Sequence, residues 1–282
     1  MNKHCVVVAI SVWVGAVALG CAAETADDDD GAAGAPSGGT SGSGGTSGSG
    51  GATGGGGQTG GAGPTGGSTG CPAIGATLMI ADFETGLDEL NDVAPRTGSF
   101  FFFNDGAAAG VQTPVKPANA AANAEAPGAC GSGYALHTTA VGYTSYAGTG
   151  AHLQPAVNDV LQVFDASPYT GVAFYAKAAA SAPIRFVVSD VNTEADGGVC
   201  DPAAVSGQTN RCGDYFGVEL TVGTEWTLYE VTFAEMTQAG WGDNPGVTAI
   251  TPAQIYSLRW KSGGNQPRGD YDLWIDQVHF MQ

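Results

Sequence analysis

The stretch CGDYFGVELTVGTEWTLYEVTFAEMTQAGWG, residues 212–242, decides the fold class of this chain. Apolar and polar side chains alternate in its first half, where the apolar set is Phe216, Val218, Leu220 and Val222. A turn follows at 223–226, and the alternation resumes from 228 to 233. Alternation on both sides of a glycine-containing turn is typical of an antiparallel hairpin with one buried face. A helix needs apolar residues at three- and four-residue spacing, which this stretch lacks.

Short runs of the same kind fill most of the chain from residue 78 to residue 280. The strongest further strand candidates are 171–178, 184–190, 255–261 and 271–280. Only 233–238 and 252–254 are suited to a helical turn. The run 99–104 holds four consecutive Phe residues, too many for a strand with one solvent-facing side, so we expect it to cross between packed layers. About ten short strands and no long helix predict an all-β fold, a two-sheet antiparallel β-sandwich.

The N-terminal residues 1–20 have the features of an export signal. An apolar run of about fourteen residues ends at Leu19, too short for a comfortable bilayer span and suited to a signal peptide. The sequence Ala18-Leu19-Gly20-Cys21 resembles the lipobox of bacterial lipoproteins, which implies cleavage before Cys21 and lipidation of that residue. Ala22 follows the expected lipidated cysteine, and a residue of this kind there resembles the targeting signal of outer-membrane lipoproteins. We therefore expect an exported, lipid-anchored protein at the outer membrane or cell surface; an ordinary signal peptide cut nearby is the alternative.

Residues 21–70 read as a flexible linker between this anchor and one domain at 71–282. Asp27–Asp30 form an acidic patch, and half of the residues from 31 to 70 are glycine, so the segment has nothing to bury. The domain carries 22 acidic and 8 basic residues. Such a negative surface argues against nucleic acid as a partner and is compatible with a neutral ligand or with calcium.

Four cysteines fall in the domain, and an even number in an exported domain indicates disulfides. Cys200 and Cys212 bracket one loop and are the expected first pair. Cys71 and Cys130 follow by elimination. A zinc site is the rival interpretation, but no two of these cysteines have C-x₂-C spacing.

Several phrases, taken together and in order, resemble a known family. They are IADFE at 80–84, GYTSY at 142–146, YTGVAFYAK at 169–177, CGDYFG at 212–217, Trp226 with Tyr229, Val231 and Phe233, and LWID at 273–276. The chain is similar to galactose-binding-like jelly rolls, and among them to carbohydrate-binding modules of the family-11 type. The resemblance implies two stacked sheets, a concave outer face that receives glycan, often a structural calcium ion, and no catalytic activity. The long loop at 105–131 departs from that family, and the concave-face residues do not match it individually.

Calcium ligands are expected where the first and last strands of such jelly rolls end. Asp82, Glu84 and Asp276 occupy the matching positions, and a carboxylate within the apolar last strand needs a partner or a cation. The alternative is that they are rim carboxylates in water or facing Arg. The oxygen-rich run from Asp190 to Asp196 lacks the glycine of an EF-hand loop, so a polar loop clamped by a disulfide is the better interpretation.

Glycan recognition needs flat aromatic surfaces with polar groups beside them. Strand alternation places one such set outward, on the condition that their strands share a sheet: Tyr215, Glu219, Arg259, Asp272 and Trp274. Trp241, between two glycines, is either a loop anchor or the lip of a binding site. The alternative for Tyr215 and Trp274 is that loops cover them, whereas Trp226 and Trp260 are expected in the core.

The function expected from the sequence is non-catalytic polysaccharide binding by a monomer anchored to a membrane. His137, His152 and His279 show neither metal spacing nor a partnered nucleophile, and no spaced carboxylate set typical of jelly-roll glycosidases occurs. An envelope adhesion or assembly component that binds protein through the same scaffold is the first alternative. A polysaccharide hydrolase or lyase is the second.

Overall fold

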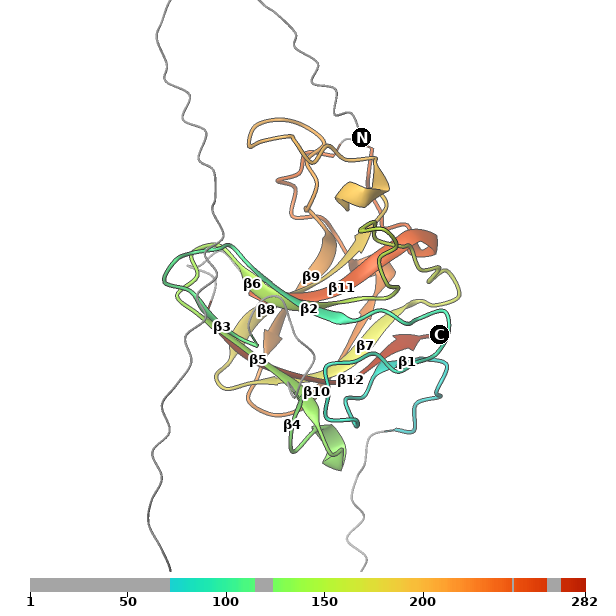
Figure 1. The fold of residues 1–282 in the computed structure, drawn as a ribbon, viewed down its shortest axis with the longest axis vertical. Coiled ribbons are helices and arrows are strands. Elements are labelled where there is room, and N and C mark those ends of the chain that lie inside the picture. The colour runs from blue at the N-terminus through green and yellow to red at the C-terminus, as the bar shows by residue number, and fades with distance from the viewer. Residues whose placement is uncertain (1–71, 115–123, 245, 263–269) are drawn as a thin grey trace, which may run out of the picture. The chain divides into compact units, whose positions relative to one another are not determined.

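The computed structural model describes residues 72–114, 124–244, 246–262 and 270–282 (Figure 1). The expected signal peptide, the lipidation site Cys21, the linker and Cys71 lie outside the described residues. Within these ranges, no helix has the length and apolarity needed to cross a membrane.

Two antiparallel sheets make up the described part of the chain. The seven-stranded sheet runs in the order β10-β7-β12-β5-β3, with β1 added to β12 and β4 to β5. Its strands are β1 (Met79–Ala81), β3 (Val111–Thr113), β4 (Ala124–Glu125), β5 (Ala135–Val141), β7 (Gly171–Ala178), β10 (Thr227–Thr232) and β12 (Tyr271–Met281). The five-stranded sheet runs in the order β2-β6-β11-β8-β9. Its strands are β2 (Phe100–Asn104), β6 (Ala147–His152), β8 (Ala182–Asp190), β9 (Phe216–Val222) and β11 (Ile255–Ser262). The predicted two-sheet antiparallel β-sandwich is confirmed.

The stretch 212–242 forms two strands as predicted, but they do not pair with each other. β9 pairs with β8 in one sheet, and β10 pairs with β7 in the other. The turn at 223–226 therefore carries the chain from one layer to the next, and the predicted hairpin is wrong. Alternation fixes which face of a strand is buried but leaves its partner open, and both strands here bury their apolar faces in the same core.

The core lies between the inner faces of the two sheets. Trp260 on β11 is fully buried, and Phe174 of the opposite sheet meets it edge-on at a centroid distance of 5.3 Å. Phe186 packs on the same indole at 5.2 Å. Trp260 is thus a core residue as predicted. Trp226 is only half-buried and lies outside the core, so its predicted core position is wrong.

The run of four Phe residues does not cross between layers, contrary to the prediction. Phe100 and Phe102 point into the core, whereas Phe101 and Phe103 are half-buried on the outer face of the five-stranded sheet. β2 is therefore an ordinary edge strand whose outward residues are also aromatic. Those outward rings contribute to the site described below.

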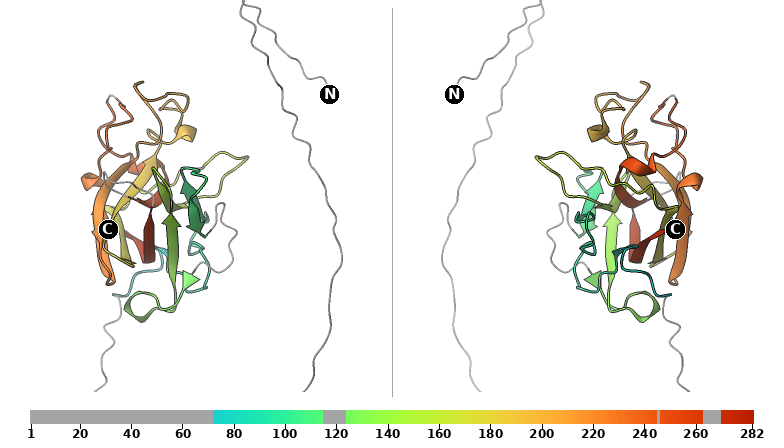
Figure 2. Two further views of the ribbon diagram at one scale, coloured as in Figure 1. Left: turned by 90° about the vertical axis from the view of Figure 1, so that its left-hand side faces the viewer. Right: turned by 90° about the vertical axis from the view of Figure 1, so that its right-hand side faces the viewer.

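Loops gather at the two ends of the sandwich. The segments 191–215 and 236–244 lie side by side at the upper end in Figures 1 and 2, joined by backbone hydrogen bonds from Asn210 and Arg211 to Asp243 and Gly242. The predicted disulfide Cys200–Cys212 closes the first of these loops. β4 and the turn after it lie at the opposite end (Figure 2). The described ranges also contain the 3-10 turns η1 (Ala129–Gly131), η2 (Ala195–Gly197), η3 (Phe233–Glu235) and η4 (Pro252–Gln254).

Candidate functional site

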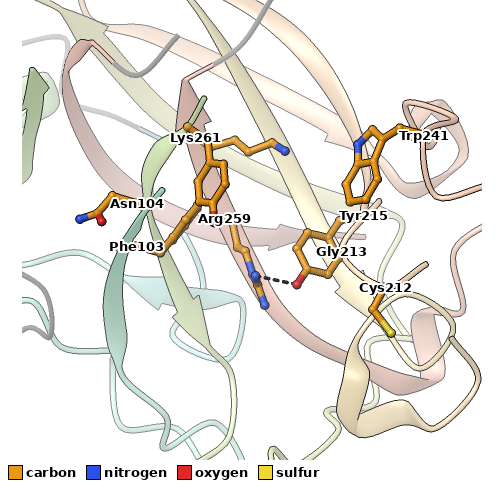
Figure 3. Close-up of a pocket in the computed structure, with 9 residues that line it drawn as sticks. Phe103, Asn104, Cys212, Gly213, Tyr215, Trp241, Arg259 and Lys261 are labelled. Atoms are coloured by element: carbon orange, nitrogen blue, oxygen red, sulfur yellow. Dashed lines mark hydrogen bonds between the residues drawn. The ribbon is translucent and has the colours of Figure 1, made fainter. Parts of the chain in front are cut away.

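A cavity of about 370 Å³ opens on the outer face of the five-stranded sheet (Figure 3). Its floor comes from β2, β11 and Tyr146 directly before β6, and the loops at 212–215 and 241 form one wall. This volume is in the range of small-molecule binding sites. Its lining residues are Phe103, Asn104, Tyr146, Cys212, Gly213, Tyr215, Trp241, Arg259 and Lys261. We call this cavity and the adjoining residues of β2 and β6 the groove.

Glycines on β6 allow the aromatic floor to form. Gly150 lies opposite Phe101 in the register of the sheet, and Gly148 lies opposite Phe103. A Cβ atom at either glycine would meet the facing phenyl ring at 2.6 Å, far below a normal contact. The bare backbone of β6 therefore lets both rings lie against the sheet, with centroids 5.8 Å apart. A pair of phenyl rings lying on a strand gives the groove an apolar floor.

His152 extends this floor by stacking on Phe101 at a centroid distance of 4.2 Å. Burial lowers the pKa of His152 to about 4, and the positive charge of Arg259 acts in the same direction. The imidazole is therefore neutral at pH 7 and behaves as one more flat ring of the groove.

Because the folded pKa of His152 lies below the usual value, the protein should lose stability as the pH falls. The contribution is complete above about pH 6.5 and is lost toward pH 4, since only the unfolded chain then takes up the proton. We expect lowering the pH from 7 to 5 to cost the wild type about 2 kcal/mol more than a His152→Gln variant. Urea unfolding of both proteins at the two pH values measures this difference. An equal loss in both would contradict the assignment.

Arg259 on β11 holds the centre of the groove together. Its Nε donates to Ser257 Oγ at 2.8 Å, one terminal nitrogen donates to Tyr215 Oη at 2.9 Å, and the other forms an ion pair with Glu194. The guanidinium also lies 4.2 Å from the Tyr215 ring centroid and 5.2 Å from that of Phe101. One planar cation thus fixes a ring of the wall against a ring of the floor. Burial raises the pKa of Tyr215 to about 12, so its hydroxyl stays protonated.

Asp214 positions the outer lip of the groove. This buried carboxylate accepts backbone hydrogen bonds from Ala239 at 3.0 Å, Gly240 at 2.8 Å and Gly242 at 2.9 Å. The loop is therefore wound around one side chain, which holds Trp241 at the rim with 44% of its surface exposed. Gly213 passes beneath with φ of +94°, and a Cβ atom there would approach the indole to 3.3 Å.

The carboxylates next to the groove are engaged within the protein. Glu194 pairs with Arg259, Asp214 binds backbone amides, and Glu219 pairs with Arg185 at 3.3 Å. The groove therefore offers ring surfaces and hydrogen-bond donors to a ligand. A sugar ring can stack its apolar C–H face on such rings while its hydroxyls meet the polar groups beside them.

No protein-family model and no curated protein matches the sequence. Solved structures similar to this chain include a family 11 carbohydrate-binding module from Clostridium thermocellum in complex with a β-1,3-1,4-mixed-linked tetrasaccharide, with 13% identity and a TM-score of 0.44 over 72% of this chain and 94% of the module. A second is the module TmCBM61 in complex with β-1,4-galactotriose, with 15% identity and a TM-score of 0.33 over 73% of this chain and 97% of the module. A third is an exo-β-agarase, with 14% identity and a TM-score of 0.40 over 72% of this chain and 25% of the enzyme. Likeness at these values does not identify a ligand of this chain.

The structure brings together three of the six predicted ligand-binding residues. Tyr215, Arg259 and Trp241 line the groove. Glu219 lies on the outer face of β9, but its side chain pairs with Arg185 and does not line the cavity. Whether these residues bind a ligand stays a prediction.

Asp272 and Trp274 do not join this patch, because β12 belongs to the other sheet. Trp274 stacks face to face on His137 at 3.8 Å, and the Lys177 ammonium lies 5.0 Å from its ring centroid and 4.9 Å from that of Trp226. Oδ1 of Asp272 lies 2.7 Å from Nε2 of His137. The single patch expected from the sequence is therefore split between the two outer faces. His137, Trp274, Lys177 and Trp226 thus form a cross-strand stack, in which the faces of the Trp274 ring contact neighbouring side chains.

The three predicted calcium ligands each hold a loop by hydrogen bonds. Asp276 accepts from Ser132 Oγ at 2.6 Å and from the Ala129 amide at 2.7 Å. Glu84 accepts from the Gly133 amide at 2.9 Å, and Asp82 accepts from the Asn91 side chain at 3.0 Å. Burial raises the pKa of Asp276 to about 6, which outweighs these hydrogen bonds. In the described ranges, no cluster of three or more His, Cys, Asp or Glu residues has a metal-binding arrangement.

The loop that begins at Asp190 and the disulfide of Cys130 were also expected from the sequence. Asp190 is buried and accepts from Thr193 Oγ1 at 2.8 Å and from the Thr251 amide at 2.9 Å, which fits the polar, clamped loop preferred over an EF-hand. Cys130 is disulfide-bonded, and its predicted partner Cys71 lies outside the described residues.

Several residues that build the groove were not assigned to a binding site from the sequence: Phe101, Phe103, Asp214, Glu194 and Lys261. Two signals were present. The glycines in AGTGAH at 147–152 alternate, which marks a strand face without side chains, and Asp214 follows a glycine directly before the strand.

Proposed function

We propose that the groove binds a polysaccharide or oligosaccharide chain. The observation that carries this proposal is the set of flat rings fixed around one guanidinium, Phe101 and Tyr215 at 5.2 and 4.2 Å from Arg259, beneath the exposed indole of Trp241. Rings held in place before binding lose little conformational entropy when a sugar stacks on them. The cavity volume suits one or two sugar residues, with the chain continuing over the floor of β2 and β6.

We propose further that this binding is not coupled to cleavage. Glycoside hydrolysis needs two carboxyl groups on either side of the bond, about 5 to 9.5 Å apart. Four carboxylates near the cavity, those of Asp105, Glu194, Asp214 and Glu219, each have a protein partner. Release of reducing ends from any bound polysaccharide by the purified protein would overturn this part of the proposal.

Electrophoresis of the purified full chain through gels containing single polysaccharides tests binding directly. We expect slower migration in at least one of a panel of β-glucans, galactans, mannans, xylans and uronans, with dissociation constants in the range of about 1 µM to 1 mM. Unchanged migration in every gel would contradict the proposal.

We also propose that lipid at Cys21 anchors the chain in a membrane, at the outer membrane or the cell surface, and that the chain acts as a monomer. The lipobox-like sequence before Cys21 supports the lipid anchor. Partition of the wild type into the detergent phase, and of Cys21→Ser into the aqueous phase, is the expected result. Partition of both proteins into the aqueous phase would contradict the proposed lipid anchor.

Calcium stays a proposal for Asp82, Glu84 and Asp276. Glu84 and Asp276 both bind the loop that follows β4, so a cation there would offset their charges and favour the ionised form of Asp276. Addition of EDTA should then lower the melting temperature by several degrees, since an ion bound only by the folded state stabilises it. An unchanged melting temperature would remove calcium from the account.

A further inference from the structure

Positive charge is scarce in this chain and concentrated at the groove. The sequence has nine Lys and Arg residues against 27 Asp and Glu. Among the described residues, six side chains are Lys or Arg, and the four at the groove or next to it are Arg185, Arg211, Arg259 and Lys261. A protein with a net charge of −18 thus places most of its described cations around one cavity.

Three of these four cations have partners within the protein. Arg259 pairs with Glu194, and Arg185 pairs with Glu219. Arg211 lies against the Trp241 ring at 4.8 Å and donates to the backbone carbonyl of the same residue at 3.3 Å. Arg259 and Arg211 thus support rings of the groove, and none of the three is available to a ligand as a free charge.

Lys261 differs from the other three. It lines the cavity, and its ammonium makes no hydrogen bond or ion pair with any side chain or backbone group of the described ranges. In Figure 3 its side chain extends over the cavity toward the wall of Tyr215 and Trp241. Its cross-strand neighbour on β8 is Arg185, and Arg259 precedes it by two positions on the same face of β11. The ammonium therefore stands at the edge of the ring platform, between two other cations.

We infer that the glycan bound by the groove is acidic, and that Lys261 binds its carboxylate or sulfate group. This inference rests on the proposed function of the groove. An anion at this point would give the half-buried ammonium a hydrogen-bonding partner and would further offset its repulsion from Arg185 and Arg259, which the charges of Asp214 and Glu219 already counteract in part. A compact ammonium suits a single carboxylate or sulfate oxygen, and the rings around it fix the sugar that carries the group.

Charges far from the groove cannot produce a preference for acidic glycans. At physiological salt the screening length is about 8 Å, so the acidic residues at the far end of the domain contribute little at the groove. The negative net charge repels polyanions in general. Tighter binding of an acidic polysaccharide than of its neutral counterpart must then come from specific contacts in the groove.

The test measures binding of the purified full chain to matched polysaccharide pairs that share a backbone and differ in charge. The pairs are polygalacturonate and its methyl ester, carboxymethyl cellulose and hydroxyethyl cellulose, and dextran sulfate and dextran. The first two supply carboxylate and the third supplies sulfate. We expect the acidic member of at least one pair to bind about tenfold more tightly in 50 mM NaCl, with a smaller ratio in 500 mM NaCl.

Variants assign that preference to one side chain. Lys261→Gln should reduce the ratio of acidic to neutral affinity at least about fivefold, and Lys261→Arg should retain it. Lys177→Gln, on the other outer face, removes the same charge from the chain and should leave the ratio unchanged. Equal affinity for both members of every pair that binds would overturn the acidic preference and leave the proposed function standing. Failure to bind any polysaccharide, charged or neutral, would overturn both.

Discussion

Replacing Arg259 by alanine is expected to abolish polysaccharide binding and to lower the free energy of unfolding by about 3 kcal/mol. The guanidinium joins Tyr215 to Phe101 and is the partner of Glu194, whose side chain is only 12% exposed. Its loss frees both rings and leaves a carboxylate without a partner at a site of low dielectric constant. Gel retardation and urea unfolding of the same protein preparation measure the two effects.

Two further variants separate charge from geometry at this position. Arg259→Lys keeps the charge but cannot make the three directed hydrogen bonds, so we expect it to bind at least about tenfold more weakly than wild type. Glu194→Gln combined with Arg259→Ala should cost less stability than the sum of the single changes, because the unpaired carboxylate is then absent. Full binding by Arg259→Ala would refute the role assigned to this residue.

Replacing Asp214 by alanine should have the second largest effect, on the lip of the groove. Three backbone amides, those of Ala239, Gly240 and Gly242, lose one shared acceptor. We expect a loss of about 3 kcal/mol and a melting temperature about 10 °C lower. Because Trp241 is held by this loop, affinity should also fall about tenfold.

Asp243→Asn is the matched control, since it removes an exposed carboxylate from the same loop. It should change neither the melting temperature nor the affinity measurably. Tryptophan fluorescence provides an independent readout, because a freed Trp241 should emit at longer wavelength in Asp214→Ala. A loop variant as stable as the control would show that the carboxylate does not organise the loop.

Local patterns in the sequence predicted the parts of the fold that depend on one strand at a time. The alternation around Phe216 and Val222 correctly gives the buried face of β9, and Trp260 is correctly placed in the core. Pairing could not be read in the same way. β9 and β10 are separated by a short turn, yet each finds its partner elsewhere in the chain, because either arrangement buries the same apolar faces.

The site residues that were predicted correctly also depend on local properties, and those that were not depend on how the strands pair. Tyr215, Arg259 and Trp241 could be named because their residue types and outward positions are local properties. Trp274 was grouped with them since nothing in the sequence states that β11 and β12 belong to different sheets. Phe101 was overlooked for a different reason. In a run of four Phe residues, alternation between core and surface leaves no trace in hydrophobicity, and only the glycines of β6 indicate space for the outward rings.

The central claim is that ligand binds on the outer face of the five-stranded sheet, and one comparison tests it most directly. Trp241→Ala and Trp274→Ala each remove one indole, from the lip of the groove and from the opposite outer face respectively. Isothermal titration with the polysaccharide that retards the wild type gives the affinity of each variant. The account predicts that Trp241→Ala binds at least about tenfold more weakly and that Trp274→Ala binds as wild type does. Loss of affinity in Trp274→Ala alone would place binding on the seven-stranded sheet and contradict the account.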